Sequence, residues 1–549
     1  MRTPRLNVDE QSDPIEVGSF FLETMTTGMY ERPLHCVREY VQNGQDAIRD
    51  AIEARIIKSG EGQILVSVGG TAKSPALVVR DNGIGIPLAK AFSTLISLGA
   101  SRKRPSQHAG FRGIGRLAGI AYCTTLRFRT KAKGEDQGTI VEYDCGLVRS
   151  YLKPGADPID VREVVRAAVK TRTFDENHDE HFTEVEMLGL TGLGLEFIEP
   201  EKLQPYLSQV APVEYADDFS FGDRIRALSK TYGDELAVVQ LDMRPKRIKT
   251  PIHKPYRNSA AVGVPGKRAD VSVLYDIEPF GSRELGWYGW IGKSNFAGEL
   301  TDATVAGIRF RVRNIQVGDT RLIEDMTEEL TASRSERRLQ RWAVGEIFIT
   351  SSLVIPNARR DGFEDNQAWR DIRYDIRDKV ARRVIKLIRE ASDGRSTLKK
   401  VVKETDELAS LTRLSKITTG QKANFQQRIN RQLAILSSNK VTGADPNEIS
   451  ALSSKLKGFL EALAKILVEE PAPPSPPPSP PPPAPSPAPP GPPGPEPGPS
   501  GGGGGRGGAS ADDQMPGTEL VEMARVEAVL TDELGEEEAV RLMGLIRES

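Results

Sequence analysis

The chain contains 549 residues, with 74 Lys and Arg side chains against 76 Asp and Glu side chains and a formal net charge of -2 at pH 7. This length exceeds what one hydrophobic core supports, so we expect two or three domains with additional tails. The net charge of the whole chain argues neither for nor against nucleic-acid binding. Any basic binding face therefore has to be local.

The cysteines and the N-terminus restrict the cellular setting. Only three cysteines occur, Cys36, Cys123 and Cys145, and they lie far apart in the sequence without the spacing of metal ligands. This usage suits a reducing compartment, excludes a disulfide scaffold and argues against a structural zinc site. The N-terminal segment has no apolar core of a signal peptide, and no run of about 18 apolar residues occurs elsewhere. We therefore expect a soluble cytoplasmic protein with no membrane partner.

Residues 15–200 mix helical and strand-like patterns. Helical patterns come first, and short runs rich in β-branched and apolar residues follow at 63–69, 76–81, 124–132 and 183–190. Such runs are typical of strands that contribute to a sheet. The segment therefore predicts a first α+β domain.

The first polar motif is REYVQNGQDAI, residues 38–48, in a helical pattern that begins after Pro33. Glu39, Asn43, Asp46 and Ala47 have the spacing of a single helix face. A carboxylate such as Glu39 can orient or deprotonate a water molecule, and the amide oxygen of Asn43 can bind Mg²⁺. Taken alone, the motif is more simply explained as a polar helix face.

The second motif is LVVRDNGIGIP, residues 77–87, in which an apolar strand runs into Asp81, Gly83 and Gly85. The two glycines permit a positive φ and a close approach of the backbone to a ligand. The carboxylate of Asp81 can accept a hydrogen bond from an exocyclic amine. Alone, the Asp-Asn-Gly sequence is only a common turn.

The third motif is HAGFRGIGRLAGI, residues 108–120, with Gly110, Gly113 and Gly115 directly before a predicted helix. Free backbone N–H groups at a helix N-terminus suit phosphate oxygens. The motif is not a Walker loop because no Gly-Lys-Ser/Thr follows, and it is a poor Rossmann fingerprint because a polar segment precedes it instead of a strand.

In this order and spacing, the three motifs resemble the N, G1 and G2 boxes of the GHKL superfamily, which includes gyrase B, the 90-kilodalton heat-shock chaperones, sensor kinases and MutL. The resemblance implies the Bergerat ATP-binding fold, an α/β sandwich in which helices cover one face of a mixed sheet. It implies ATP and Mg²⁺ as ligands, with Glu39 as the general base, Asn43 as the Mg²⁺ ligand and Asp81 as the residue that reads adenine.

The resemblance also implies the rest of the nucleotide site. Residues 110–115 would form a phosphate loop at the hinge of a lid, and Thr183 would match the adenine-side threonine of the family. The further nucleotide-binding residues are Asp46, Ala47, Gly83, Gly85, Leu98, Gly99, Gly110, Phe111, Arg112, Gly113, Ile114 and Gly115.

Within the superfamily, the chain looks nearest to the heat-shock chaperone branch, because residues 20–48 echo the opening helices of that branch. Residues 354–365, VIPNARRDGFED, look like the middle-domain loop whose arginine reaches the γ-phosphate. Arg360, or its neighbour Arg359, would fill that catalytic role by neutralising charge on the transferred phosphoryl group. The alternative is a surface cluster of salt bridges.

The remainder of the chain predicts four further parts. Residues 201–395 mix strand-like runs, at 236–243, 270–277, 287–292, 307–318 and 342–350, with a helix over 371–391, which indicates a transducer-like α+β middle domain. Residues 396–470 have apolar residues at helical spacing and predict a helical region. A Pro/Gly-rich segment at 471–508 predicts a disordered linker, and residues 509–549 predict a short acidic helical tail.

Two features depart from the chaperone pattern, and they leave general protein-folding activity open. The lid is short and rich in Arg and Lys at residues 101–104, and no C-terminal dimerisation region of the chaperone type is recognisable. A homodimer through the ATP-binding domains or the helices of 396–470 remains an expectation, as does an unidentified protein client or partner.

Three alternatives share the nucleotide pocket. A sensor kinase would need a phosphoacceptor histidine on a helical hairpin, and none of the five histidines, His35, His108, His178, His181 and His253, has that setting. A DNA-linked ATPase similar to MutL or MORC proteins would use the basic stretch 244–268, which we do not favour because basic loops are usually only solvated. A binding module that uses ATP without turnover is disfavoured by the presence of Glu39 and Arg360. We therefore expect an ATPase that works as a Mg²⁺-ATP-dependent conformational clamp.

Overall fold

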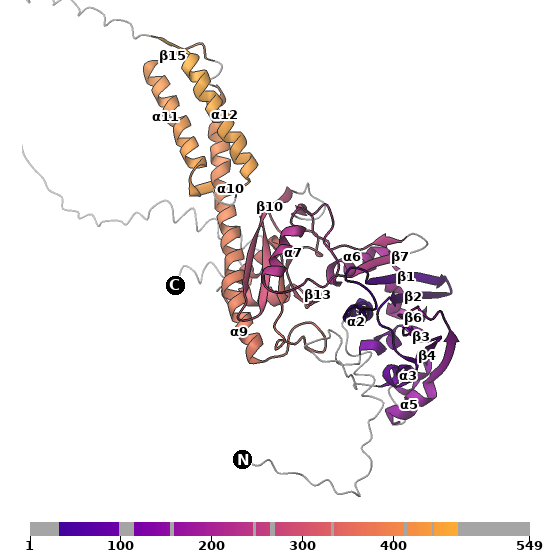
Figure 1. The fold of residues 1–549 in the computed structure, drawn as a ribbon. Coiled ribbons are helices and arrows are strands. Elements are labelled where there is room, and N and C mark those ends of the chain that lie inside the picture. The colour runs from indigo at the N-terminus through magenta and orange to yellow at the C-terminus, as the bar shows by residue number, and fades with distance from the viewer. Residues whose placement is uncertain are drawn as a thin grey trace, which may run out of the picture. The chain divides into compact units, whose positions relative to one another are not determined.

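The computed structural model describes residues 32–97, 115–153, 159–244, 249–263, 270–330, 334–410, 414–441 and 444–469. All of them belong to one compact unit, Met1–Ala472, and the predicted linker and acidic tail lie outside the described residues (Figure 1). None of the described helices combines the length and apolar character that a bilayer crossing requires. The fold is mixed α+β, with two large sheets and a group of long helices.

The first domain is built on an eight-stranded mixed sheet with the order β5-β4-β3-β6-β2-β1-β7-β8. Neighbouring strands are antiparallel except β1 and β7, which run parallel. The strands are β1 (Gln63–Thr71), β2 (Ser74–Asp81), β3 (Cys123–Lys131), β4 (Gln137–Asp144), β5 (Val169–Asp175), β6 (Phe182–Leu190), β7 (Gln240–Arg244) and β8 (Thr250–Pro251). The strand expected over 236–243 is shorter and begins only at Gln240, and it joins this first sheet although it lies beyond residue 200.

Helix α2, Leu34–Glu53, packs its apolar side on this sheet. Its buried Val37, Val41 and Ile48 share one core with Ile64 and Leu77 of the central strands. The other helices of the first domain and of its connection to the second are α3 (Leu88–Ile96), the 3-10 helix η1 (Gly115–Ala121), α4 (Cys145–Tyr151), α5 (Val161–Ala168), the 3-10 helix η2 (Gly192–Ile198), α6 (Pro200–Val210) and α7 (Gly222–Thr231). The predicted helix after the third glycine motif is therefore a 3-10 helix.

The second domain, from β9 to α9, contains a six-stranded sheet with the order β13-β12-β14-β11-β10-β9. Its elements are β9 (Ser259–Val262), β10 (Asp270–Ser282), β11 (Trp287–Ser294), β12 (Gly307–Val312), β13 (Ile315–Val317), α8 (Arg321–Glu328), the 3-10 helix η3 (Arg334–Trp342), β14 (Val344–Ile349) and α9 (Gln367–Ile376). Helices α8 and α9 cover one apolar side of this sheet, where Ile323 of α8 and Trp369 of α9 share a core with Phe310 and Ile347 of the strands.

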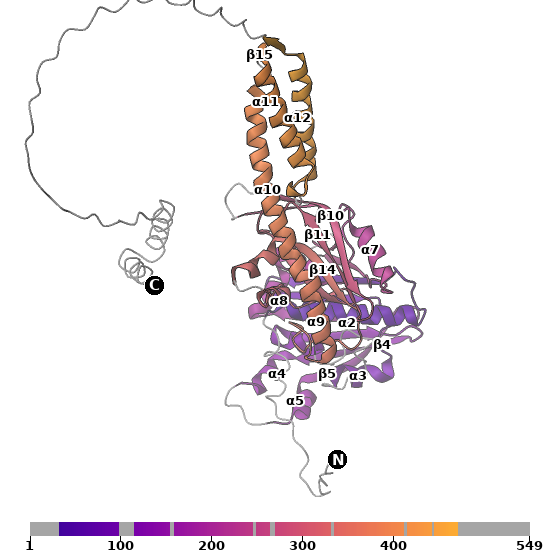
Figure 2. The same ribbon diagram turned by 90° about the vertical axis from the view of Figure 1, so that its left-hand side faces the viewer.

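A group of long helices follows the second domain (Figure 2). The helix expected over 371–391 is observed as α9, a π-helical turn at Arg377–Ala381, and α10, which continues through Arg382–Ala409. Helices α11 (Thr419–Leu436) and α12 (Pro446–Lys465) pack on the C-terminal half of α10, and two short strands, β15 (Lys416–Thr418) and β16 (Leu467–Glu469), pair beside them. Thr418 and Gln421 form a capping box that begins α11.

The core of the second domain contains a buried carboxylate, Glu346 of β14, which is fully shielded from solvent. Lys254 donates from Nζ to Glu346 at 2.7 Å, Trp290 donates from Nε1 at 3.2 Å, and Tyr215 and Arg311 contact the same carboxylate. Burial disfavours the charged form, but attraction from Arg311 and Lys254 outweighs it and lowers the pKa of Glu346 to about 2. The carboxylate therefore stays ionised as the counter-charge of Arg311, whereas burial and Arg311 lower the pKa of Lys254 to about 7.

Replacing Glu346 by Gln should lower the free energy of unfolding by about 3–5 kcal/mol, because the buried Arg311 loses its counter-charge and Lys254 loses a charged acceptor. Denaturant unfolding at pH 7 measures this. The folded pKa lies below that of an unfolded glutamate, about 4.3, so the carboxylate's contribution is present above that pH and is lost as the pH falls toward 2. Glu299→Gln, which breaks a half-exposed pair with Arg341, should cost less than about 1 kcal/mol. Equal losses in the two variants would contradict the assignment.

Candidate functional site

The four predicted polar-motif residues of α2 lie on one helix, which confirms the expected helix over residues 38–48. Glu39 is 7% exposed and Asp46 is 2% exposed, whereas Asn43 is only half-buried. Buried carboxylates are costly unless partners compensate them. The contacts of Glu39 therefore indicate which groups compensate its buried charge.

The second motif packs directly against α2. Asp81 ends β2, and its Oδ1 accepts a hydrogen bond from the N–H of Gly83 at 2.8 Å. The N–H of Ile84 donates to the carbonyl oxygen of Ala47 at 3.0 Å, and a Cβ on Gly83 would lie 2.5 Å from the Cβ of Ala47. Gly85 has φ +67° and faces the carbonyl oxygen of Lys131 with no room for a side chain. Gly83 is therefore required where the motif meets α2, and Gly85 where it meets the end of β3.

Asp81 and Thr183 are directly opposite each other in the antiparallel pairing of β2 and β6. The hydroxyl of Thr183 lies 3.1 Å from that of Thr130, and Thr130 Oγ1 also accepts from the N–H of Ile86 at 2.9 Å. Thr130 therefore lies beside the residues of the candidate site. The sequence did not indicate it, because the alternation of a strand does not show which other strand pairs with its end. These residues place a carboxylate and two hydroxyls together at one end of the sheet.

The third motif is described only from Gly115 onward; Leu98, Gly99, Gly110, Phe111, Arg112, Gly113 and Ile114 lie outside the described residues, as do the lid residues 101–104. A Cβ on Gly115 would lie 2.5 Å from Glu39 Oε2, so the end of the glycine motif abuts the carboxylate. The Tyr40 hydroxyl accepts from the N–H of Gly119 at 2.9 Å and donates to the carbonyl oxygen of Arg116 at 3.1 Å. The glycine motif is thereby fastened to α2.

Arg360 reaches Glu39 from the second domain. Its Nε lies 3.3 Å from Glu39 Oε1, and Nη2 of Arg38 lies 3.6 Å from the same oxygen. Arg360 is 6% exposed, whereas Arg359 is exposed and contacts α2 only through its carbonyl oxygen, which accepts from Arg38 Nη2 at 3.4 Å. Of the two arginines expected to serve this role, the structure brings the side chain of Arg360 to the site.

The backbone of Arg360 is left-handed, with φ +57°, a conformation that costs energy for any residue with a Cβ. The loop is nevertheless fixed, because the N–H of Arg360 donates to the carbonyl oxygen of Asn357 at 3.1 Å and its own carbonyl oxygen accepts from Gly318 at 2.8 Å. The surrounding loop therefore holds the guanidinium at Glu39 in spite of the strain.

Two histidines lie close to the site. His35 of α2 is half-buried, and burial together with Arg38 and Arg32 lowers its pKa to about 3, so the ring stays neutral. A half-buried, neutral ring at the start of α2 does not have the exposed position that a phosphoacceptor histidine requires. His181 was not predicted as a site residue, yet its Nδ1 lies 2.8 Å from the carbonyl oxygen of Gly83.

The three cysteines are free thiols, and all are buried. Cys123 and Cys145, distant in sequence, bring their sulfur atoms to 3.8 Å from each other in the core of the first domain. Burial is the largest cause of the raised pKa of Cys36, so this thiol is unreactive. The part of the chain that the structure describes contains no group of three or more His, Cys, Asp or Glu side chains arranged to hold a metal ion.

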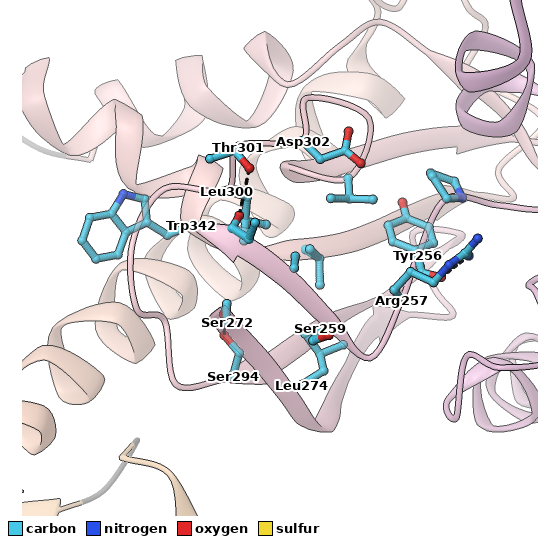
Figure 3. A pocket seen from close by; sticks show the side chains of 15 residues that line it. Tyr256, Arg257, Ser259, Ser272, Leu274, Ser294, Leu300, Thr301, Asp302 and Trp342 are labelled. Carbon is cyan, nitrogen blue, oxygen red and sulfur yellow. Dashed lines mark hydrogen bonds between the residues drawn. The ribbon is translucent and has the colours of Figure 1, made fainter. Parts of the chain in front are cut away.

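A separate cavity of about 260 Å³ lies in the second domain (Figure 3). Three of its hydroxyls already have partners, since those of Ser272 and Ser294 are 3.0 Å apart and that of Thr301 donates to the carbonyl oxygen of Ala261. No residue of the three motifs lines it. The cavity is therefore not part of the site around Glu39.

Residues 31–169 match the family of histidine kinase-, DNA gyrase B- and HSP90-like ATPases. This segment is a GHKL-type ATPase domain. The matched residues include α2, Asp81, Gly83, Gly85 and Gly115, whereas Thr183 and Arg360 lie beyond them. No curated protein matches the chain.

Replacing Gly115 by Ala should displace the carboxylate of Glu39 in the ATPase domain, because the new Cβ would lie 2.5 Å from its Oε2. We expect kcat for ATP hydrolysis to fall by about tenfold or more, since a displacement near 1 Å can cost about 10²-fold. The control is Gly69→Ala, whose Cβ would meet nothing within 4 Å. Steady-state phosphate release measures both, and an unchanged kcat in Gly115→Ala would show that the contact is irrelevant to turnover.

Proposed function

We propose that the chain is a Mg²⁺-dependent ATPase that works as a conformational clamp, hydrolysing ATP to ADP and phosphate. One observation carries the proposal: Glu39 is met by Gly115 of the glycine motif and by Arg360 of the second domain. A carboxylate and a guanidinium beside a phosphate-type loop are the groups that phosphoryl transfer to water uses. The family match at residues 31–169 supports ATP as the nucleotide.

The contacts at the sheet end suit the adenine ring. Asp81 can accept from an exocyclic amine, and Thr183 and Thr130 add hydroxyls beside it. Asn43 is half-buried on the same helix face as Glu39 and supplies an amide oxygen, a ligand type that Mg²⁺ accepts. Mg²⁺ commonly combines one or two protein ligands with substrate phosphates, and when bound it would neutralise charge on those phosphates.

In the proposed reaction, water attacks the γ-phosphorus, its proton passes to Glu39, and the bond between the γ-phosphorus and the β–γ bridging oxygen breaks. Arg360 would neutralise charge on the transferred group. In the described arrangement Arg360 is paired with Glu39 itself, at 3.3 Å. A γ-phosphate would compete for the guanidinium and release the carboxylate to accept a proton. Turnover would then be limited by the rearrangement of the two domains more than by chemistry.

The described part of the basic stretch 244–268 gives little support to DNA binding. Lys254 is fully buried against Glu346, Lys249 pairs with Asp242 at 2.8 Å, and Arg257 lies 3.8 Å from Asp218. These cations already have carboxylate partners. We therefore keep a protein client, in a role similar to that of the heat-shock chaperones, as the proposed partner of the clamp, and a homodimer remains a prediction.

Replacing Glu39 by Ala should lower kcat by about 10²- to 10⁴-fold while ATP still binds, because the general base is lost and the adenine contacts remain. Steady-state hydrolysis beside calorimetric binding of Mg²⁺-ATP measures the two effects. Glu163→Ala, which removes an exposed acid on α5, is the control and should behave as the wild type. If wild type binds ATP but releases no phosphate, the chain is a nucleotide-gated binding module, and if it does not bind, the proposed site is wrong.

Replacing Arg360 by Gly removes the guanidinium but keeps a residue that accepts φ +57°. We expect kcat to fall by about 10²- to 10³-fold, the usual cost of losing a group that stabilises transition-state charge, with little change in KM. Arg359→Ala is the matched control, since the side chain of Arg359 is exposed. A larger loss in Arg359→Ala than in Arg360→Gly would exchange the roles of the two arginines.

A further inference from the structure

Helix α2 has a second polar face, distinct from the one that carries Glu39. Arg38, Gln42, Gln45 and Arg49 recur at the spacing of one helix side, and the first three are nearly or fully buried. Gln45 donates from Nε2 to the carbonyl oxygen of Arg313 at 3.1 Å, and Arg38 donates to the carbonyl oxygen of Arg359. This face therefore contacts the second domain, while the neighbouring face carries the proposed nucleotide site.

The element that Gln45 contacts is a strained turn. Strands β12 and β13 are joined by only two residues, Arg313 and Asn314, with φ +52° and +64°. Two consecutive left-handed residues are the geometry of a type I′ hairpin, which Asn tolerates and which is unfavourable for Arg. Arg313 therefore carries backbone strain at the point where the turn meets α2.

Charged side chains of α2 and of the Arg360 loop act on the guanidinium of Arg313. Burial lowers the pKa of its guanidinium, which is also close enough to Arg49 and Arg360 to be repelled by them and to Asp46 to be attracted. Directly after β13, the N–H of Gly318 donates to the carbonyl oxygen of Arg360 at 2.8 Å, so the hairpin that carries Arg313 contacts α2 through Gln45 and the Arg360 loop through Gly318.

On its other side, the turn is tied into the core of the second domain. Arg311 donates from Nη1 to the carbonyl oxygen of Asn314 at 2.9 Å and pairs with the buried Glu346. Asn314 also donates from Nδ2 to the carbonyl oxygen of Ala237 at 3.0 Å. Polar contacts therefore run without interruption from α2 through the turn to the Glu346 cluster.

We propose that the Arg313–Asn314 turn is a positioning element of the ATPase, which senses the state of α2 and transmits it to the core of the second domain while keeping Arg360 in register with Glu39. This inference rests on the proposed function, because it assumes that the nucleotide binds on α2. Arg313 acts through Arg360 and α2 and does not itself contact the nucleotide. Coupling of this kind requires a physical contact that both sites bias, and the turn supplies one.

Intrinsic fluorescence can report on this coupling directly. The chain has four tryptophans, Trp287, Trp290, Trp342 and Trp369, and all of them lie in the second domain. Trp290 donates to the buried Glu346, and Trp287 donates from Nε1 to Asp375 at 3.0 Å. A nucleotide bound in the ATPase domain therefore changes the tryptophan emission only if the second domain responds.

The experiment titrates the full chain with Mg²⁺ and the non-hydrolysable imidodiphosphate analogue of ATP, and measures binding by calorimetry and tryptophan emission in parallel. Wild type should bind and change its emission. Arg313→Gly, which keeps the turn but removes the guanidinium, should bind within about threefold of wild type yet lose more than about half of the emission change, a coupling effect in the usual range. Gln45→Ala, which removes the contact from the α2 side, should lose emission change in the same way.

The matched control is Arg55→Gly. Arg55 is another arginine with a left-handed backbone, φ +58°, but it is exposed beyond the end of α2 and touches neither the turn nor the site. This variant should bind and respond as the wild type does. Arg313→Lys, which retains a cation, should recover part of the response that Arg313→Gly loses.

Each of the following outcomes would contradict one statement of the proposal. Failure of wild type to bind the analogue would refute the proposed nucleotide site. Binding without any emission change in wild type would refute coupling to the second domain. Binding with a full emission change in both Arg313→Gly and Gln45→Ala would show that the signal bypasses the turn, and an equal loss in Arg55→Gly would show a general effect of glycine on stability.

Discussion

A carboxylate buried on a helix has to be compensated, and in this protein part of the compensation of Glu39 comes from another domain. Glu39 is 7% exposed and has Arg360 at 3.3 Å and Arg38 at 3.6 Å. Removing Arg360 would leave Glu39 with Arg38 alone, so the buried carboxylate would be less well compensated. The ion pair therefore links the stability of the contact between the domains to the charge of the group proposed to take the proton. Any ligand that draws Arg360 away alters both at once.

Helix α2 makes this linkage possible because its sides serve three different surroundings. Its apolar side, with Val37 and Ile48, is held in the sheet core, so the helix cannot shift freely. The side with Glu39 carries the proposed chemistry, and the side with Gln45 meets the second domain. A change in the contacts of α2 with the sheet core or with the second domain would therefore affect both domains. Two second-domain residues that meet the helix, Arg313 and Arg360, have left-handed backbones.

The local sequence predicted those parts of the site that depend on short-range pattern. The helix over 38–48 and the strand that ends at Asp81 are confirmed, because helical spacing and an apolar run followed by Gly and Asn are local signals. The GHKL family is confirmed by the match at residues 31–169. The roles of the individual residues stay predictions.

The remaining features depend on contacts between segments that are distant in the sequence. Local patterns in a single sequence do not reveal these contacts. Thr130 joins Thr183 only through the register of β3 and β6, and β7 adds to the first sheet from beyond residue 200. The choice of Arg360 over Arg359 depends on a left-handed backbone set by the loop around it. The contact between Gln45 and the Arg313 turn spans 268 residues, so only the folded chain reveals it.

The most direct test of the central claim is Mg²⁺-dependent phosphate release from ATP by the purified full chain, measured under single-turnover conditions with and without the metal. The account predicts saturable release that requires Mg²⁺, with chemistry faster than the rearrangement that precedes it, so that the observed rate follows domain movement. Saturable ATP binding with no Mg²⁺-dependent phosphate release would contradict the assignment of Glu39 and Arg360 as a hydrolytic pair.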